Sequence, residues 1–570
     1  MAGCRQAGVN PYMLSAGRGA RAWSVRIGTL IGAALLAFAA APANGFGQDR
    51  PEASPAPATI PLKQFPAAKA QDTSTGDTNA GSAHPAPGAA PGAISNEKDS
   101  PEAIRRRAEW FYKQRSSVSG HIPAGAHLQA LQHMQRMMEA EGKLLRRADG
   151  SYAPAEQPSG GTAWAPVGPT PTTGGIFSPV TGRITTIAVD PSDSTGNTLL
   201  IGGAQGGIWR STDAGITWTP VGDQNASLAM GSIAFAPSSP STVYAGTGEQ
   251  ASIGFDIYYG AGVLKSMDGG ITWAQTCTTP SPSCPFIGPY TDEFFGSPGF
   301  GYFNFGGARI SYISVSPSNS NLLLAATQFV LEGPMEGVYC SQDGGATWSN
   351  VLSGEMATFV GFAASGTAYA ALGNPYGSSP GAPHPNGIYK ATGISSTCSS
   401  ISFKPVPGSG LPQLTSLGRI DLGIAPSDPN TIYASISGNA DGSSTNLGVF
   451  VSTNGGANWT KTAAPDVCQF QCWYDNVVKV DPNNKSIAFF GGAAVITSSG
   501  GAPSWVVRTQ NAGTNWSTVI PNSSPGDAGV PHVDTHALAF VKLPSGKVRL
   551  YLGNDGGIWR TDDAEAASIT

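Results

Sequence analysis

The sequence is poor in charged residues and in cysteine. Lys, Arg, Asp and Glu together make up 12% of its 570 residues, and the formal net charge at pH 7 is −5. A nucleic-acid-binding protein needs a basic face, and nothing in this composition provides one. The sequence also has no apolar run long enough to cross a membrane outside its N-terminal region. We therefore expect neither a nucleic-acid partner nor a membrane span in the mature chain.

The N-terminal region has the pattern of a secretory signal peptide. Three arginines precede the apolar run 27–41, and Ala41-Pro42-Ala43 offers an A-x-A cleavage site. An uncleaved membrane anchor is the alternative, although the run is short for a full span. We assign residues 1–43 to the signal peptide and expect a secreted, periplasmic or cell-surface protein.

Seven cysteines are present, and Cys4 would leave with the signal peptide. An even number in an exported chain favours disulfides. We expect two short loop staples, Cys277 with Cys284 and Cys468 with Cys472. The pairing of Cys340 with Cys398 stays open. The spacing of Cys468 and Cys472 would also suit a metal, but no second Cys or His pair lies near them in the sequence.

Two segments separate the signal peptide from the main domain. Residues 44–99 are rich in Ala, Pro, Gly and Ser and have few large apolar groups, which predicts a disordered linker. Residues 100–148 are predicted to form a helical hairpin that begins at Ser100 as N-cap and is broken at 121–125.

A phrase of the form Ser/Thr-x-Asp/Asn-x-Gly-x-Thr/Asn-Trp, here called the eight-residue repeat, occurs five times. Its third residue can accept hydrogen bonds from backbone N–H groups of its own turn, and its glycine supplies a positive φ. Its tryptophan is expected to bury its ring in the next strand. We assign structural roles to the third and eighth residues of the copies: Asp213, Asp268, Asp343, Asn454, Asn511, Trp218, Trp273, Trp348, Trp459 and Trp516.

Short apolar runs divided by Gly, Pro, Asn and Asp flank each repeat and predict four antiparallel strands per unit. Such units are the blades of a β-propeller. The interval between Asp343 and Asn454 is about twice the usual one, so a unit with a degraded repeat is expected near 387–393. The last unit lacks its fourth strand, and residues 163–168 resemble the strand that follows the first repeat. We predict an all-β, seven-bladed propeller over 160–570, its last blade closed by 163–168; a second, truncated propeller is the alternative.

The eight-residue repeat resembles the Asp box, or BNR repeat, of sialidases, sortilin, xyloglucan-active glucanases and photosystem assembly propellers. The resemblance to exported bacterial BNR-repeat proteins covers about 100–563. It implies a sialidase-like or sortilin-like propeller and little defined chemistry. Arg183-Ile184-Thr185 and Arg309-Ile310-Ser311 lack the proline of the sialidase motif, and Ala204-Gln205-Gly206-Gly207 lacks the acid that xyloglucanases have before their first box.

Acidic residues at strand ends are the candidates for catalysis. Glu249 and Asp555 each follow the second strand of their blade, so both are expected to point to one face, and Asp534 is near Asp555 in the same blade. Glycoside hydrolysis usually needs two carboxylates roughly 5–9.5 Å apart. Hydrogen bonding within loops is the structural alternative for all three.

Aromatic and acidic loops are the candidates for ligand binding. They contribute Tyr258, Tyr259, Asp292, Glu293 and Phe294. His532, Asp534 and His536 alternate along an expected strand, so their side chains would share one side, which suits a weak metal site or a polar strand mouth.

These features predict an exported propeller that binds a glycan or protein ligand on one face. The alternatives are a glycoside hydrolase and an assembly or stability factor. No cofactor is expected, and the chain is expected to be a monomer.

Overall fold

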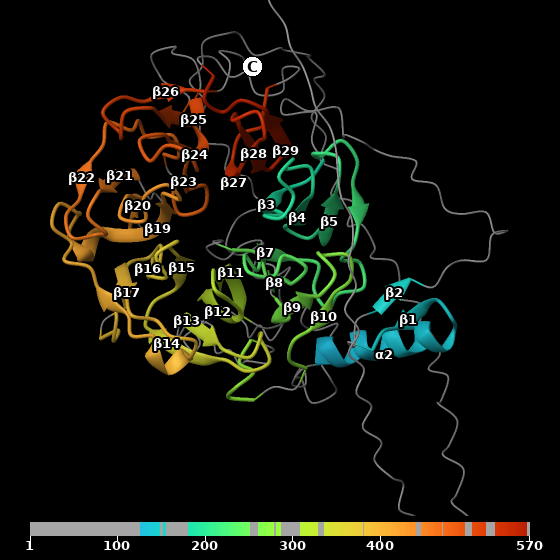
Figure 1. The fold of residues 1–570 in the computed structure, drawn as a ribbon. Coiled ribbons are helices and arrows are strands. Elements are labelled where there is room, and N and C mark those ends of the chain that lie inside the picture. The colour runs from blue at the N-terminus through green and yellow to red at the C-terminus, as the bar shows by residue number, and fades with distance from the viewer. Residues whose placement is uncertain are drawn as a thin grey trace, which may run out of the picture. The chain divides into compact units, whose positions relative to one another are not determined.

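The computed structural model describes residues 126–148, 152–154, 181–250, 260–278, 281–286, 308–328, 336–379, 381–439, 446–469, 471–495, 504–519 and 530–566. Within these ranges, seven antiparallel sheets follow one another along the chain and stand around a common axis (Figure 1). The prediction of an all-β, seven-bladed propeller is therefore confirmed. The predicted signal peptide, linker and closing strand 163–168 lie outside the described residues.

Each blade is a meander in which consecutive strands pair. The strands of blades 1 to 4 are β3 (Ile184–Val189), β4 (Leu199–Gly203), β5 (Ile208–Ser211) and β6 (Thr219–Pro220); β7 (Met230–Phe235), β8 (Val243–Thr247), β9 (Val263–Ser266) and β10 (Ala274–Gln275); β11 (Arg309–Ser316), β12 (Asn319–Gln328), β13 (Gly337–Ser341) and β14 (Ser349–Ser353); β15 (Ala357–Phe362), β16 (Ala368–Leu372), β17 (Gly387–Ala391) and β18 (Lys404–Pro405). Blade 4 is the unit predicted to have a degraded repeat.

The last three blades follow the same order, and 3-10 turns η2 (Cys398–Ser400) and η3 (Leu414–Ser416) lie before them. Their strands are β19 (Leu417–Ile424), β20 (Ile432–Gly438), β21 (Asn446–Ser452) and β22 (Thr460–Lys461); β23 (Val477–Val480), β24 (Ala488–Val495), β25 (Ser504–Thr509) and β26 (Ser517–Thr518); β27 (Thr535–Lys542), β28 (Val548–Asn554) and β29 (Gly557–Thr561). Blade 7 thus has three strands among the described residues.

The first strand of each blade lies innermost, against the first strands of its two neighbours (Figure 1). A bulge interrupts six of these strands near their start, and the corresponding place in blade 6 directly precedes β23. The residues at this level, which we call the bulge ring, are Thr185, Gly231, Ser311, Thr358, Arg419, Asn476 and His536.

Hydroxyl groups of the bulge ring join neighbouring blades. Thr185 donates to the carbonyl of Met230 at 2.6 Å, and Thr358 donates to that of Ile420 at 2.6 Å. A bulge turns one extra side chain out of the ladder, which leaves these hydroxyls available to bond to the next blade.

The ring closes by side-chain packing between blades 7 and 1. Tyr551 is 1% exposed, packs with Ile184 and Leu199, and donates its hydroxyl to the carbonyl of Gly196 at 2.9 Å. The backbone N–H of Thr181 also donates to the carbonyl of Gly556 at 2.8 Å. These contacts stabilise the seam independently of any fourth strand in blade 7.

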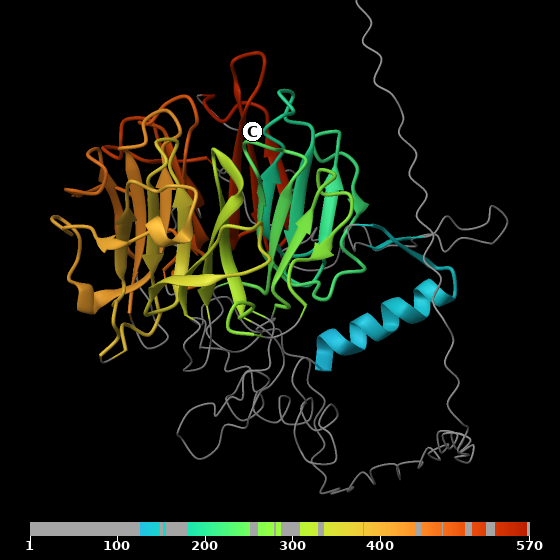
Figure 2. The same cartoon turned by 60° about the horizontal axis from the view of Figure 1, so that its bottom comes forward.

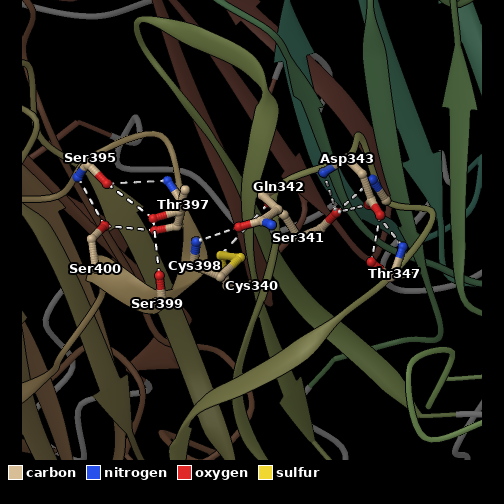
Figure 3. Close-up of a disulfide and its surroundings, with 11 residues drawn as sticks. Cys340, Ser341, Gln342, Asp343, Thr347, Ser395, Thr397, Cys398, Ser399 and Ser400 are labelled. Atoms are coloured by element: carbon tan, nitrogen blue, oxygen red, sulfur yellow. Dashed lines mark hydrogen bonds between the residues drawn. A yellow bond between two sulfur atoms is a disulfide. The ribbon is translucent and has the colours of Figure 1, made fainter.

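The eight-residue repeat forms the turn between the last two strands of a blade. Asp343 accepts from the hydroxyl of Ser341 at 2.8 Å and from the backbone N–H of Thr347 at 2.9 Å (Figure 3). Three of the repeat tryptophans are buried as expected, at 3–5% exposure: Trp273, Trp348 and Trp459. Trp218 and Trp516 keep more exposed surface. The repeat tryptophan is therefore not fully buried in every blade.

Three disulfides are present, including both predicted staples, Cys277–Cys284 and Cys468–Cys472. The third joins Cys340 and Cys398, the pair that sequence left open, and connects blade 3 to blade 4 beside the repeat turn of Asp343 (Figure 3). The disulfide expectation is confirmed.

The segment before the propeller differs from a helical hairpin in its described part. Helix α2 (Ala126–Ala140) ends before Gly142, whose φ is 68°. The chain then forms the strand pair β1 (Leu144–Arg146) and β2 (Tyr152–Pro154) instead of continuing as a helix to 148. Residues 100–125 lie outside the described ranges. None of the described helices is long and apolar enough to span a membrane.

Candidate functional site

The candidate site lies at the end of the propeller where the innermost strands begin, here called the axial face. Figure 2 shows the blades from the side, with their strands running between this face and the opposite one. The loops between the second and third strands of a blade, and those between blades, reach the axial face. The repeat turns connect the third and fourth strands, so they lie at the opposite face. The site is thus separated from the repeat carboxylates.

Arg183, directly before β3, is the centre of a network between blades. Its Nη1 donates to Oε1 of Glu249 at 2.7 Å, and its Nε donates to Oδ1 of Asp555 at 2.9 Å. Tyr474, which precedes β23, donates its hydroxyl to the same Oε1 of Glu249 at 2.6 Å. Arg183 also lies over the Tyr474 ring, 5.3 Å from its centroid. Blades 1, 2, 6 and 7, which are consecutive around the ring, therefore meet at one guanidinium.

His536 connects this guanidinium network to a second carboxylate. Its Nε2 lies 2.5 Å from Oδ1 of Asp555, and its Nδ1 lies 3.2 Å from Oδ1 of Asp475, an ion-pair contact. Asp475 is fully buried and accepts from the amide of Gln471 at 2.9 Å. The same amide lies 3.3 Å from Oδ1 of Asp534. Four acids thus share one cluster with Arg183 and His536.

The environments of these acids move their pKa values in opposite directions. Burial acts to raise the pKa of Asp555, but His536 and Arg183 outweigh it and lower the value to about 2. Burial and the neighbouring Asp555 raise the pKa of Asp534 to about 6. Burial also raises the pKa of Asp475 well above its ordinary value. One acid is therefore held ionised while two beside it retain protons more easily.

The basic groups respond to the same charges. Burial acts to lower the pKa of His536, but Asp475 and Asp555 outweigh it and raise the value. Burial likewise opposes the charge on Arg183, but Tyr474, Asp555 and Glu249 outweigh it and raise its pKa. Both groups therefore stay cationic more readily than they would in isolation.

All three predicted catalytic acids belong to this cluster. Glu249 and Asp555 contact nitrogens of the same guanidinium, at 2.7 and 2.9 Å. Their carboxylates are therefore not too far apart for the separation of roughly 5–9.5 Å that glycosidases use. The side chain of Glu249 is 0% exposed, whereas that of Asp555 is 27% exposed. Asp555 and the half-buried Asp534 are therefore the acids that a ligand can reach directly.

The expectation that His532, Asp534 and His536 share one side is wrong. β27 begins at Thr535, and Asp534 has a φ of 62°, so the three residues do not alternate on a strand. His532 Nδ1 lies 3.0 Å from the carbonyl of Val533, while His536 faces Asp475 and Asp555. In the described part of the chain, the compact group of possible metal ligands is instead Asp466 with Cys468 and Cys472, whose sulfurs form a disulfide.

The predicted ligand-binding residues Tyr258, Tyr259, Asp292, Glu293 and Phe294 lie outside the described residues. The described residues next to these segments are Glu249 and Gln250, which follow β8, and Ala308, which precedes β11.

Sequence reasoning missed Arg183, Tyr474 and Asp475 as site residues. Arg183 stood out only as the first residue of a strand motif that lacks a proline. Tyr474 and Asp475 lie just after the Cys468–Cys472 disulfide. This position could have marked them as site residues, because a disulfide at the end of a loop can hold the following side chains in place.

No protein-family model matches this sequence, and no curated protein matches it. The fold is similar to solved propellers at low identity. An ancestral GH74 enzyme is 14% identical with a TM-score of 0.44, over 69% of this chain and 46% of that one. YCF48 bound to D1 peptide is 13% identical with a TM-score of 0.40, over 68% and 95%. The GH74 xyloglucanase of Xanthomonas campestris is 12% identical with a TM-score of 0.34, over 67% and 73%. This chain thus spans less than half the length of the ancestral enzyme. These similarities concern the propeller fold alone.

Proposed function

We propose that this protein is an exported propeller that binds a carbohydrate at the axial face, on the Arg183–Asp555 pair. The observation that carries the proposal is the partial exposure of this pair, 29% for Arg183 and 27% for Asp555, beside the buried side chains of Glu249, Asp475 and His536. Arg183 lies directly before β3 and Asp555 lies in the turn between β28 and β29, and their buried partners Glu249 and His536 fix their orientation. A few converging polar groups are the usual means by which a binding site fixes the orientation of its ligand.

The atoms left for a ligand suit vicinal hydroxyl groups. Oδ1 of Asp555 accepts from His536 and Arg183, whereas its Oδ2 has one described contact, to Nη2 of Arg183 at 3.5 Å. A carboxylate oxygen has two acceptor sites, and a guanidinium nitrogen such as Nη2 has two donors. A sugar hydroxyl can therefore accept from Nη2 while its neighbour donates to Oδ2. The ring of Trp473, stacked on Tyr474 with centroids 5.3 Å apart, supplies an apolar face nearby.

Binding to an array of neutral and acidic oligosaccharides tests the proposal. Asp555→Asn is expected to lose binding, because the amide can no longer accept at both atoms. Asp428→Asn is the matched control, since Asp428 forms an ion pair with Lys485 at 2.7 Å on the opposite face. Equal binding by the two variants, or capture of a protein but no glycan, contradicts the proposal.

A glycoside hydrolase is the second candidate, favoured by the separated pKa values of Asp534 and Asp555. A carboxyl group with a pKa of about 6 can act as a general acid, and one with a pKa of about 2 can act as base or nucleophile. Release of reducing sugar that disappears in Asp534→Asn and persists in Asp428→Asn supports this function. Glu249, which we first paired with Asp555, fits a supporting role because its side chain is fully buried.

Export is part of the proposal. Three disulfides support an oxidising compartment, and they agree with the signal peptide predicted over residues 1–43. Secretion of the chain and N-terminal sequencing of the product would test this. A cytosolic product that retains residues 1–43 contradicts it.

A further inference from the structure

A cavity of about 180 Å³ lies on the propeller axis, distinct from the exposed Arg183–Asp555 pair. The innermost strands of six blades line it, and its polar lining includes Arg419, Asp421, Asn476, Lys479 and His536. A single water needs only about 10–15 Å³ of such volume, so the cavity is large enough for a small organic molecule. His536 belongs both to this lining and to the network of the axial face.

The cavity is polar on one side because of the bulge ring. Blades 1 to 4 place Thr, Gly, Ser and Thr at this level, and the hydroxyls bond to neighbouring strands. The next three blades place Arg419, Asn476 and His536 there instead. Blades 5, 6 and 7 therefore line the cavity with N–H-bearing side chains, where blades 1 to 4 have Thr, Gly or Ser at this level.

Several of these groups have unused hydrogen-bonding capacity. Arg419 is 5% exposed and Asn476 is 1% exposed. Within the described part of the chain, Nε of Arg419 and both amide atoms of Asn476 have no hydrogen-bond partner. Buried polar atoms normally have partners, and leaving one unsatisfied is destabilising. Groups of this kind on a cavity wall indicate a ligand that completes them.

The charges on the cavity wall indicate the sign of that ligand. Arg419 donates to the carbonyl of Tyr474, and Lys479 donates to the hydroxyl of Tyr312 at 3.0 Å. Neither cation forms an ion pair with a carboxylate among the described residues. Asp421, the one acid among the lining residues, attracts both cations, and it accepts from the backbone N–H of Val478 at 2.8 Å. Lys479 also lies over the rings of Tyr312 and Phe359. Two buried cations facing one acid leave the lining with a net positive charge, which favours a bound anion.

We propose that this axial cavity binds the carboxylate of a small organic acid through Arg419 and Asn476, with Lys479 as a further source of positive charge. The planar carboxylate matches two N–H donors, one from the guanidinium and one from the amide. The ligand of this cavity is a free small acid, and its binding does not depend on carbohydrate binding at the axial face.

Thermal unfolding of the full chain in acetate, lactate, sulfate and chloride at equal ionic strength tests the proposal. A ligand that binds only the folded state raises Tm with the logarithm of its concentration once that concentration exceeds Kd. Acetate or lactate is expected to raise Tm in this way, and isothermal titration should give a matching Kd. Asn476→Leu and Arg419→Met should each weaken carboxylate binding at least about tenfold.

Arg508→Met is the matched control. Arg508 is also a buried arginine, but its Nη1 donates to the carbonyls of Ala564 and Ala566 and it does not line the cavity. It should retain the carboxylate-dependent rise in Tm. If Arg419→Met does not fold, Asn476→Leu decides the result. An equal rise in chloride, a response to sulfate alone, or an unchanged Kd in Asn476→Leu overturns the proposal.

Discussion

Replacing Arg183 by glutamine tests whether one guanidinium holds the axial face together. The variant keeps a polar side chain but leaves Glu249, which is 0% exposed, with Tyr474 as its described partner. Removing one partner of a buried ion pair costs about 3–5 kcal/mol because the other charge stays buried. Arg183 is 29% exposed, so solvent screening places the expected loss at the lower end, about 3 kcal/mol.

Urea denaturation followed by tryptophan fluorescence measures this loss. Adding Glu249→Gln to Arg183→Gln should recover about 1–3 kcal/mol relative to the sum of the single variants, because the double variant buries no unpaired charge. Lys485→Gln is the control: its ion pair with Asp428 is exposed, with Lys485 at 51%, so it should change stability by less than about 1 kcal/mol. If Arg183→Gln behaves like Lys485→Gln, or if the double variant is strictly additive, the network does not hold the blades.

Three further predictions concern the repeat, the pH dependence and the disulfides. Trp348→Ala should lower the free energy of unfolding by about 3–5 kcal/mol, because this ring is 3% exposed, and Trp218→Ala should cost less; equal losses in urea denaturation would contradict this. The pKa of Asp555 is lowered from 3.8 to about 2, so the acid contributes about 2 kcal/mol that is present above pH 3.8 and lost as the pH falls through 2. Asp555→Asn should therefore show a smaller loss of stability in acid, and a pH dependence identical to that of the parent would refute the assignment. Reducing Cys340–Cys398, which closes a loop of 58 residues, should lower stability by about 4 kcal/mol in the chain-entropy model; free thiols in the denatured, unreduced protein would show that the bond is absent.

The proposed binding sites would explain how a propeller with ordinary repeats acquires a specific face. The bulge ring has Thr, Gly or Ser in blades 1 to 4, and Arg419, Asn476 and His536 in blades 5 to 7. The extra residue of a bulge can change without disturbing the ladder on either side. Recognition can therefore be added at this level while the core between blades stays the same.

The blades could be predicted because their determinants are local. Asp343 lies two residues from its partner Ser341 and four residues from its partner Thr347, so the turn can be read directly from the sequence. The same holds for the two short disulfides. Trp218 departed from the expectation because its burial depends on the neighbouring blade, which its own repeat does not specify.

The partners of the site residues could not be predicted in this way. Sequence position suggested that Glu249 and Asp555 point to one face, but Glu249 meets Arg183 across 66 residues and Tyr474 across 225. Such distant contacts exist only once the ring has closed, since closure brings the last blades beside the first. The chain alone determined the repeating unit and its turns; the closed ring decided which charges meet, because burial and Coulomb energy depend on distances in space.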